Sequence, residues 1–200
     1  AEPLFRSDYF MVNSIEELRL LRQVSKKPTF LLGYVAPVFL GEAIRLGCIL
    51  GVFSLEQFHE VERAAAKMKM VQEVHIACDA LLGREGFLEK DLTTVFRAAK
   101  KSTRVQVTGM YAHFANIEDT NNLTHAERQL AVYARMKQIA QVEGFGDAMT
   151  HIAATSGLLA YESAAQMNPL VRVGIGMYGI WPSDHLQYRH GDRKSGSAGM

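Results

Sequence analysis

The sequence predicts an α/β fold, a (β/α)8 barrel that lacks its first strand. Short runs rich in β-branched and aromatic residues alternate with longer amphipathic segments along most of the chain. Repeats of strand, helix and strand build parallel sheets. An open doubly wound sheet fits the same alternation, but no GxGxxG follows the first apolar run, which disfavours its dinucleotide-binding form. A whole barrel needs about 250 residues, and this chain has 200. We therefore expect strands two to eight, in a segment of a longer protein.

The expected strands are short apolar runs bounded by polar or turn-forming residues. They cover residues 9–12, 29–32, 49–53, 71–77, 105–114, 148–153 and 170–175. Amphipathic segments separate these runs. The first begins with Ser14, and Glu17 completes a capping box for a helix with Ile15, Leu18 and Leu21 on one face. The other expected helices cover residues 38–46, 55–67, 88–100 and 124–143.

The domain organisation follows from this pattern. Residues 1–183 carry the alternation and are expected to form the barrel domain. Residues 184–200 are expected to be a polar linker or tail, since the last dozen residues, RHGDRKSGSAGM, are polar and rich in glycine and serine and are expected to be unstructured.

The composition narrows the class of protein. A hydrophobic content of 48% and a charged content of 22% suit one globular core, and a net charge of +1 gives no basic footprint for nucleic acid. No run reaches the roughly 18 apolar residues of a membrane helix, and the first residues lack a signal peptide pattern, so we expect a cytoplasmic protein without a membrane partner. Cys48 and Cys78 lie in apolar runs and are expected to be reduced core thiols. No HExxH, acidic cluster or GxSxG occurs, and no metal is expected.

The candidate site residues follow the later strands, because a barrel places its chemistry at the carboxyl ends of its strands. The stretch VRVGIGMYGIWPS contains Arg172, whose guanidinium stays charged and needs an acceptor or an anion when buried. Gly174 and Gly176 allow close approach of backbone N–H groups, and Ser156 offers a hydroxyl, which together suit a phosphate. The alternatives are that the glycines mark a bulge or tight packing and that His113, at another strand end, is a structural histidine.

Five motifs in register resemble the alanine racemase family. VRVGIGMYGIWPS resembles the family's VRPGIAMYG followed by Pro-Ser. VTGMYAHFANIED, HIAATSGLL, GREGF and GVFSLEQF resemble further family motifs, and the similarity covers residues 6–183. The resemblance implies a barrel that binds pyridoxal 5′-phosphate, a C-terminal β domain after this segment, and a homodimer. It also implies interconversion of L- and D-alanine through an aldimine of that cofactor, supplying D-alanine for peptidoglycan.

The resemblance also assigns roles to residues at matching positions. Arg172 is expected against the pyridine nitrogen, with His113 holding the arginine in place. The phosphate is expected to contact Ser156, Gly174 and Ile175. Arg84 is expected to contact the phenolic oxygen of the cofactor and the carboxylate region of the substrate.

Several positions depart from the family pattern. The family's DTGMGRLG reads DALLGREG here, so Ala80, Leu81 and Glu85 replace the usual residues, and Thr155 replaces an asparagine. Ala77 occupies the place of a modified lysine that supports the arginine in some members. The Schiff-base lysine of the first strand and the tyrosine base of the C-terminal domain have no counterpart, so the segment alone is expected to be inactive. Racemases of serine, lysine or broader specificity remain alternatives, as does a noncatalytic cofactor-binding barrel.

Overall fold

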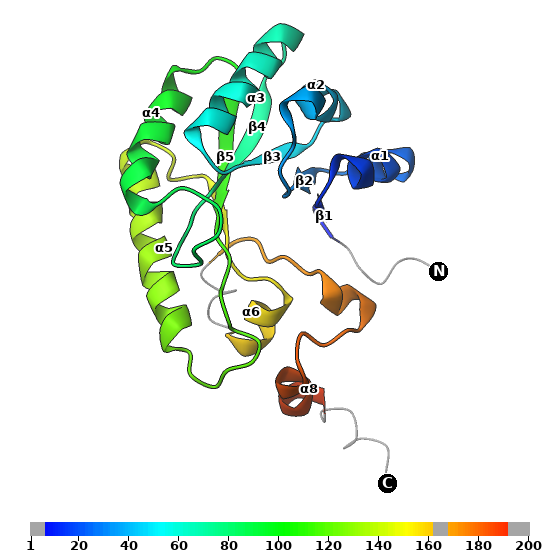
Figure 1. The fold of residues 1–200 in the computed structure, drawn as a ribbon, viewed down its shortest axis with the longest axis vertical. Helices are drawn as coiled ribbons and strands as arrows, with labels where there is room; N and C mark the ends of the chain where they lie inside the picture. Colours follow the sequence, from blue (N-terminus) through cyan, green and yellow to red (C-terminus); the bar gives the residue numbers. More distant parts are fainter. Residues whose placement is uncertain (1–6, 162–167, 192–200) are drawn as a thin grey trace.

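The computed structural model describes residues 7–161 and 168–191. Its centre is a sheet of six parallel strands, in which each strand pairs with the next one along the chain (Figure 1). The strands are β1 (Phe10–Val12), β2 (Thr29–Leu31), β3 (Ile49–Val52), β4 (Gln72–Ala77), β5 (Val105–Tyr111) and β6 (Met149–His151). Within the described residues β1 and β6 do not pair, so the curled sheet is an incomplete barrel.

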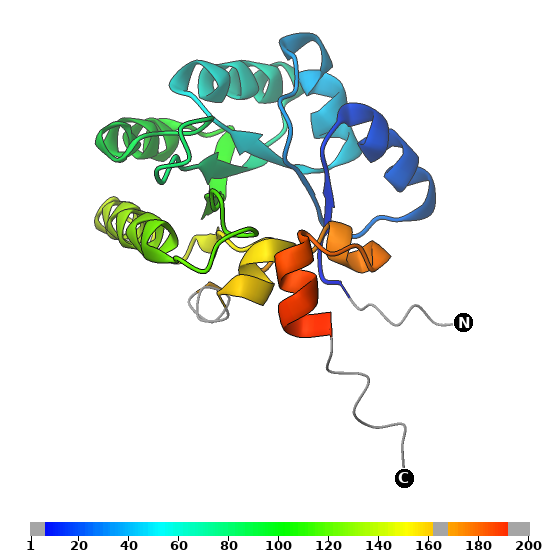
Figure 2. The same cartoon turned by 60° about the horizontal axis from the view of Figure 1, so that its bottom comes forward.

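Helices follow one another around the outside of this sheet (Figure 2). The helices that connect the strands are α1 (Ile15–Val24), α2 (Pro37–Leu46), α3 (Leu55–Met68), α4 (Leu92–Lys101), preceded by the 3-10 turn η1 (Glu89–Asp91), and α5 (Thr124–Val142). After β6 come α6 (Thr155–Ala160), the 3-10 turn η2 (Ile175–Tyr178) and α8 (Asp184–Gly191). These last segments lie on the side between β6 and β1.

The helix boundaries follow from side-chain caps in the sequence. The Ser14 hydroxyl accepts a hydrogen bond from the backbone N–H of Glu17 at 3.3 Å, as the capping box predicts. Ser54 caps α3 in the same way, through the N–H of Gln57 at 3.2 Å. Helix α2 ends at Gly47, whose φ of +68° lies in the left-handed region that glycine adopts without strain.

The two faces of the sheet carry different residues, because successive strand side chains point to opposite sides. The larger core lies between sheet and helices and includes Leu50, Val74 and Met110. The opposite face, inside the curl of the sheet, carries a smaller buried cluster of Phe30, Ile49, Ala77 and Tyr111. The interior of the incomplete barrel is therefore aromatic toward the end where β4 and β5 terminate.

Two sequence predictions about elements are wrong in detail. Residues 170–175 do not form a seventh strand: the N–H of Arg172 donates to the carbonyl of Ala153 at 3.0 Å, but no strand ladder continues from that bond, and the 3-10 turn begins at Ile175. The first part of the expected polar tail forms α8, where Leu186 is buried. The rest of that tail, residues 192–200, lies outside the described residues.

Candidate cofactor site

The candidate residues gather at one edge of the sheet. Strands β4, β5 and β6 are parallel, so their carboxyl ends lie side by side. The Asp79–Gly86 loop follows β4, His113 follows β5, and Ser156 follows β6. The backbone of Arg172 joins the same edge through its hydrogen bond to Ala153.

Arg172 is a buried cation that contacts neutral acceptors. Its side chain is 5% exposed. Nη2 donates to the carbonyls of Ala112 and Ile152, each at 2.7 Å. Nη1 donates to Nδ1 of His151 at 2.7 Å, whereas Nε is buried without a partner among the described residues. Burial lowers the pKa of Arg172 to about 10, so the guanidinium is still charged near neutral pH.

His151 is a candidate site residue that the sequence analysis did not identify. It is the last residue of β6 and is fully buried. Its Nε2 lies 3.0 Å from Nδ1 of His75 in β4. His151 begins the HIAATSGLL motif. A histidine near the carboxyl end of an expected strand is the sequence signal that could have identified this residue.

His113 lies near Arg172 but is a weaker partner than His151. Its Nδ1 is 3.5 Å from Nη2 of Arg172, at the limit of a hydrogen bond, and its Nε2 is buried without a partner in the described chain. Burial, with the charges of Arg172 and Arg84, lowers the pKa of His113 to about 3. The imidazole is therefore neutral and has one nitrogen available to another group.

Tyr111 covers one side of the arginine and histidine pair. Its ring stacks on His151 with centroids 5.1 Å apart and planes 7° apart, and the guanidinium of Arg172 lies 5.8 Å from its centroid. Phe30 packs edge-on to both rings. The hydroxyl of Tyr111 is buried without a partner among the described residues.

The glycine-rich segment after Arg172 packs on the start of α6. The N–H of Gly174 donates to the Thr155 hydroxyl at 3.1 Å, so Thr155 connects the two segments. A Cβ at Gly176 would lie 2.7 Å from the methyl carbon of Thr155, which explains a glycine there by tight packing. Ser156 lies in the first turn of α6, and Ile175, 45% exposed, begins η2.

The Asp79–Gly86 loop is held in place by hydrogen bonds to the Asp79 carboxylate. The Asp79 carboxylate accepts the N–H groups of Leu82 at 2.8 Å and Gly83 at 3.0 Å. Arg84 is exposed and makes a two-pronged ion pair with the neighbouring Glu85, which raises the pKa of Arg84. In this structure the guanidinium of Arg84 is therefore occupied by a carboxylate of its own loop.

Gln129 of α5 connects the two loops that carry Arg84 and His113. Its Nε2 donates to the carbonyls of Ala80 at 2.8 Å and His113 at 3.0 Å. Its Oε1 accepts the N–H of Ala115 at 2.9 Å. A fully buried amide that bonds to three backbone groups is a positioning element, and no sequence pattern indicated it.

The model of the family described as "Alanine racemase, N-terminal domain" matches residues 3–182. The chain belongs to this family. Alanine racemase 1 of Oceanobacillus iheyensis is 24% identical over 182 residues, covering 90% of this chain and 48% of that protein. The alanine racemase of Lactobacillus acidophilus is 29% identical over 171 residues, covering 85% of this chain and 44% of that protein. This chain thus spans about half the length of the curated alanine racemases that it matches.

Solved alanine racemases share the fold. The enzyme from a D-cycloserine-producing Streptomyces lavendulae superposes with a TM-score of 0.83 at 26% identity, over 90% of this chain and 47% of that one. An alanine racemase of Clostridium difficile 630 in complex with cycloserine superposes with a TM-score of 0.83 at 24% identity, over 90% of this chain and 49% of that one. The incomplete barrel therefore has the fold of the N-terminal barrel of alanine racemases.

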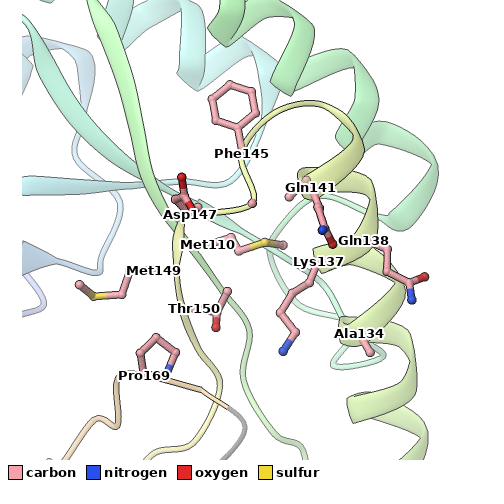
Figure 3. Close-up of a pocket in the computed structure, with 13 residues that line it drawn as sticks. Met110, Ala134, Lys137, Gln138, Gln141, Phe145, Asp147, Met149, Thr150 and Pro169 are labelled. Carbon is pink, nitrogen blue, oxygen red and sulfur yellow. The ribbon is translucent and has the colours of Figure 1, made fainter.

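One cavity lies away from the candidate site residues. It has a volume of about 620 Å³ between α5 and the strands β5 and β6, and Figure 3 shows Lys137 of α5 and Thr150 of β6 at its wall. Neither Arg172 nor any other candidate residue lines it. The described residues contain no group of three or more histidine, cysteine or acidic side chains placed to hold a metal. None of the described helices is long and apolar enough to cross a membrane.

Proposed function

We propose that the full-length protein is an alanine racemase that uses pyridoxal 5′-phosphate to interconvert L- and D-alanine and so supplies D-alanine for peptidoglycan. The observation that carries this proposal is the environment of Arg172. Buried cations ordinarily pair with carboxylates. Arg172 instead donates to two carbonyls and a neutral histidine, and its Nε has no partner in the described chain.

A pyridine nitrogen fits this donor set. It is a neutral acceptor without a proton of its own, and a guanidinium can donate to it without being able to accept. Nε2 of His113 and Nε of Arg172, which both have no hydrogen-bond partner among the described residues, lie at the same edge of the sheet. Ser156, with the backbone of Gly174 and Ile175, would hold the phosphate, and Arg84 would contact the phenolic oxygen.

The bound cofactor would supply an electron sink for the substrate's α-carbon. Arg172 would bind the ring nitrogen and keep its own proton there, because even its lowered pKa of about 10 lies far above that of a pyridinium. A ring nitrogen that is not protonated makes a weaker sink. By holding the ring nitrogen without a proton, Arg172 would favour racemisation over side reactions that need a stronger electron sink.

The two bases of the reaction are expected outside this chain. None of the residues that directly follow the six strands is a lysine, so we infer that the lysine and the tyrosine come from other parts of the full-length protein and that this segment alone is inactive. We also infer that residues 184–200 lead toward a C-terminal β domain and that the protein works as a cytoplasmic homodimer. The matching relatives named alanine racemase support these inferences.

A second candidate is a racemase for serine, lysine or several amino acids. The observation that favours it is the ion pair between Arg84 and Glu85. A carboxylate beside Arg84 reduces the positive charge available to the carboxylate region of a substrate. A different substrate side chain could suit that altered surface better than alanine does.

The test uses the full-length protein and its Arg172→Ala variant. Arg128→Ala, at an exposed position of α5, is the matched control. Pyridoxal 5′-phosphate binding is measured by absorbance, and racemisation is measured with L-alanine, L-serine and L-lysine. We expect the wild type and the control to bind cofactor and to racemise alanine fastest, and Arg172→Ala to lose at least about a hundredfold in rate, more than 2.7 kcal/mol of transition-state stabilisation. A wild type that binds no cofactor contradicts the proposal.

A further inference from the structure

Three buried side chains form a directional chain of hydrogen bonds behind the candidate site. Arg172 Nη1 lies 2.7 Å from Nδ1 of His151. Nε2 of His151 lies 3.0 Å from Nδ1 of His75. Arg172, His151 and His75 are 5%, 0% and 2% exposed, so water does not compete for these bonds.

The direction of each bond follows from the arginine. A guanidinium only donates, so Nδ1 of His151 must accept and carry no proton. A neutral His151 then has its proton on Nε2 and donates it to Nδ1 of His75. His75 in turn has its proton on Nε2. Burial and the charge of Arg172 lower the pKa of His151 well below its usual value, which keeps this single arrangement.

Strand β5 is shaped to receive the His75 ring. The pairing of β4 with β5 shifts between Val74 and His75, so that His75 pairs with Gly109 and Thr108 is passed over. A Cβ at Gly109 would lie 2.5 Å from Nε2 of His75. Gly109, beside the bulge, thus leaves room in β5 for the imidazole of His75.

Aromatic rings hold the two histidines in place. Phe30 lies 4.9 Å from the His75 centroid and 5.4 Å from that of His151. Tyr111 stacks on the face of the His151 ring, with centroids 5.1 Å apart. The ring of His151 therefore cannot turn without displacing a neighbour, and the acceptor that defines its orientation is His75.

We propose that His75 is a positioning residue that fixes the tautomer of His151 and, through it, aims the Arg172 guanidinium at the ring nitrogen of the cofactor. The aim toward a cofactor rests on the proposed function, whereas the tautomer chain does not. His75 touches neither cofactor nor substrate in this proposal. Its contribution is to give His151 one stable hydrogen-bonded state, with Nδ1 always facing the arginine.

The first experiment reads the tautomers directly. The chain is labelled with ¹⁵N-histidine, and the ring nitrogens are observed by NMR at pH 7 without cofactor. We expect His75 and His151 both to show the neutral form protonated at Nε2. A His151 ring protonated at Nδ1, or a charged His151, overturns the proposal whether or not the protein binds pyridoxal phosphate.

Two substitutions separate positioning from simple packing. In His75→Asn the side-chain oxygen occupies about the place of Nδ1 and still accepts from His151, whereas His75→Leu fills the space without an acceptor. We expect His75→Asn to keep the ¹⁵N signals of His151 and the cofactor affinity of the full-length protein. We expect His75→Leu, at equal circular dichroism, to shift the His151 signals and weaken pyridoxal phosphate binding about tenfold, the effect of one lost hydrogen bond.

The outcomes distinguish this proposal from the proposed function. If His75→Leu leaves the His151 signals unchanged, His75 has no positioning role and the proposal fails. If the tautomers and their response to His75→Leu are as expected but the wild type binds no cofactor, the chain of hydrogen bonds stands and the racemase proposal fails. If His75→Leu does not fold, equal signals in His75→Asn and wild type still support the acceptor role, and a changed His151 tautomer in His75→Asn contradicts it.

Discussion

Nδ1 of His151 accepts a hydrogen bond from Nη1 of Arg172 at 2.7 Å, and both side chains are buried. The bond gives one nitrogen of the buried Arg172 guanidinium an acceptor inside the barrel. Because no carboxylate bonds to Arg172 among the described residues, the histidine and two carbonyls satisfy the cation by hydrogen bonding alone. This relationship makes His151 a residue on which both stability and site geometry depend.

The first prediction concerns His151→Ala. The substitution removes an acceptor from a buried charge and leaves a cavity beside Tyr111, so we expect the free energy of unfolding to fall by about 3 kcal/mol. The measurement is urea unfolding at pH 7.5. His125→Ala, at an exposed position of α5, is the control and should change it by less than about 0.5 kcal/mol. Equal stabilities of the two variants would contradict the role given to His151.

The second prediction is loss of stability on the acid side. Burial lowers the pKa of His75 to about 4, and burial with the charge of Arg172 lowers that of His113 to about 3, against a usual 6.5. The unfolded chain therefore binds more protons than the folded one, and stability falls as the pH drops below about 6.5. Between pH 7 and pH 5, we expect each of these histidines to lower the free energy of unfolding by about 2 kcal/mol.

Urea unfolding at several pH values between 5 and 7 measures this slope. The range lies above the usual pKa of exposed carboxylates, so the histidines dominate it. His75→Asn should reduce the pH dependence of the free energy of unfolding by the contribution of one histidine, and His125→Asn, at an exposed position of α5, is the control. A protein equally stable at pH 5 and 7 would show that these imidazoles are not held neutral.

The third prediction concerns the space that Gly109 provides for His75. A Cβ at position 109 would lie 2.5 Å from the imidazole, so we expect Gly109→Ala to lower the free energy of unfolding by about 2 kcal/mol. Gly146→Ala is the control, because the nearest atom to its Cβ would be a side-chain carbon of the flexible Gln141, at 3.3 Å. In a His75→Ala background the cost of Gly109→Ala should nearly vanish. A cost that persists there would place the clash elsewhere.

Much of the fold could be predicted because it is encoded locally. Ser14 and Glu17 mark the start of α1, and the strands from β1 to β6 lie within the expected apolar runs. The run at 170–175 was mistaken for a strand because apolar content alone does not supply a ladder. Helix α8 was missed because its sequence is mostly polar and its one buried anchor, Leu186, gives no periodic signal.

The site was predictable only where chemistry is visible in one residue. Arg172 stood out because a permanent charge is unusual in an apolar run, and the structure buries it as expected. His75 and His151 lie 76 positions apart, so only the parallel sheet brings their rings together. Glu85 looked like a simple departure from a motif, and its ion pair with Arg84 became evident only in three dimensions.

The fourth prediction concerns the cysteines. Cys48 and Cys78 are both free and buried, as expected from the apolar runs around them. Burial raises the pKa of the Cys48 thiol to about 12 and raises that of Cys78 further. Because the thiolate is the reactive form, neither should react with a disulfide reagent at pH 8 in the folded protein, and both should react in denaturant. Rapid reaction without denaturant would show that the core opens locally.

The last prediction concerns Gln129, which connects the loops after β4 and β5. Gln129→Leu keeps the volume but leaves the carbonyls of Ala80 and His113 and the N–H of Ala115 without their partner. Each unsatisfied buried group costs about 1–3 kcal/mol, and the loops can relax toward water, so we expect a net loss of about 3 kcal/mol.

Hydrogen exchange gives the sharper measurement for Gln129→Leu. The amide of Ala115 should exchange at least about tenfold faster, since its hydrogen bond is lost, while amides in α3 keep their rates relative to global stability. Gln141→Leu, on an exposed part of the same helix, is the control and should change neither quantity. Gln129→Glu keeps the acceptor for Ala115 but not the donor for the two carbonyls. Protection of Ala115 in Gln129→Glu but not in Gln129→Leu would therefore assign the effect to this one bond, and equal exchange in both would refute it.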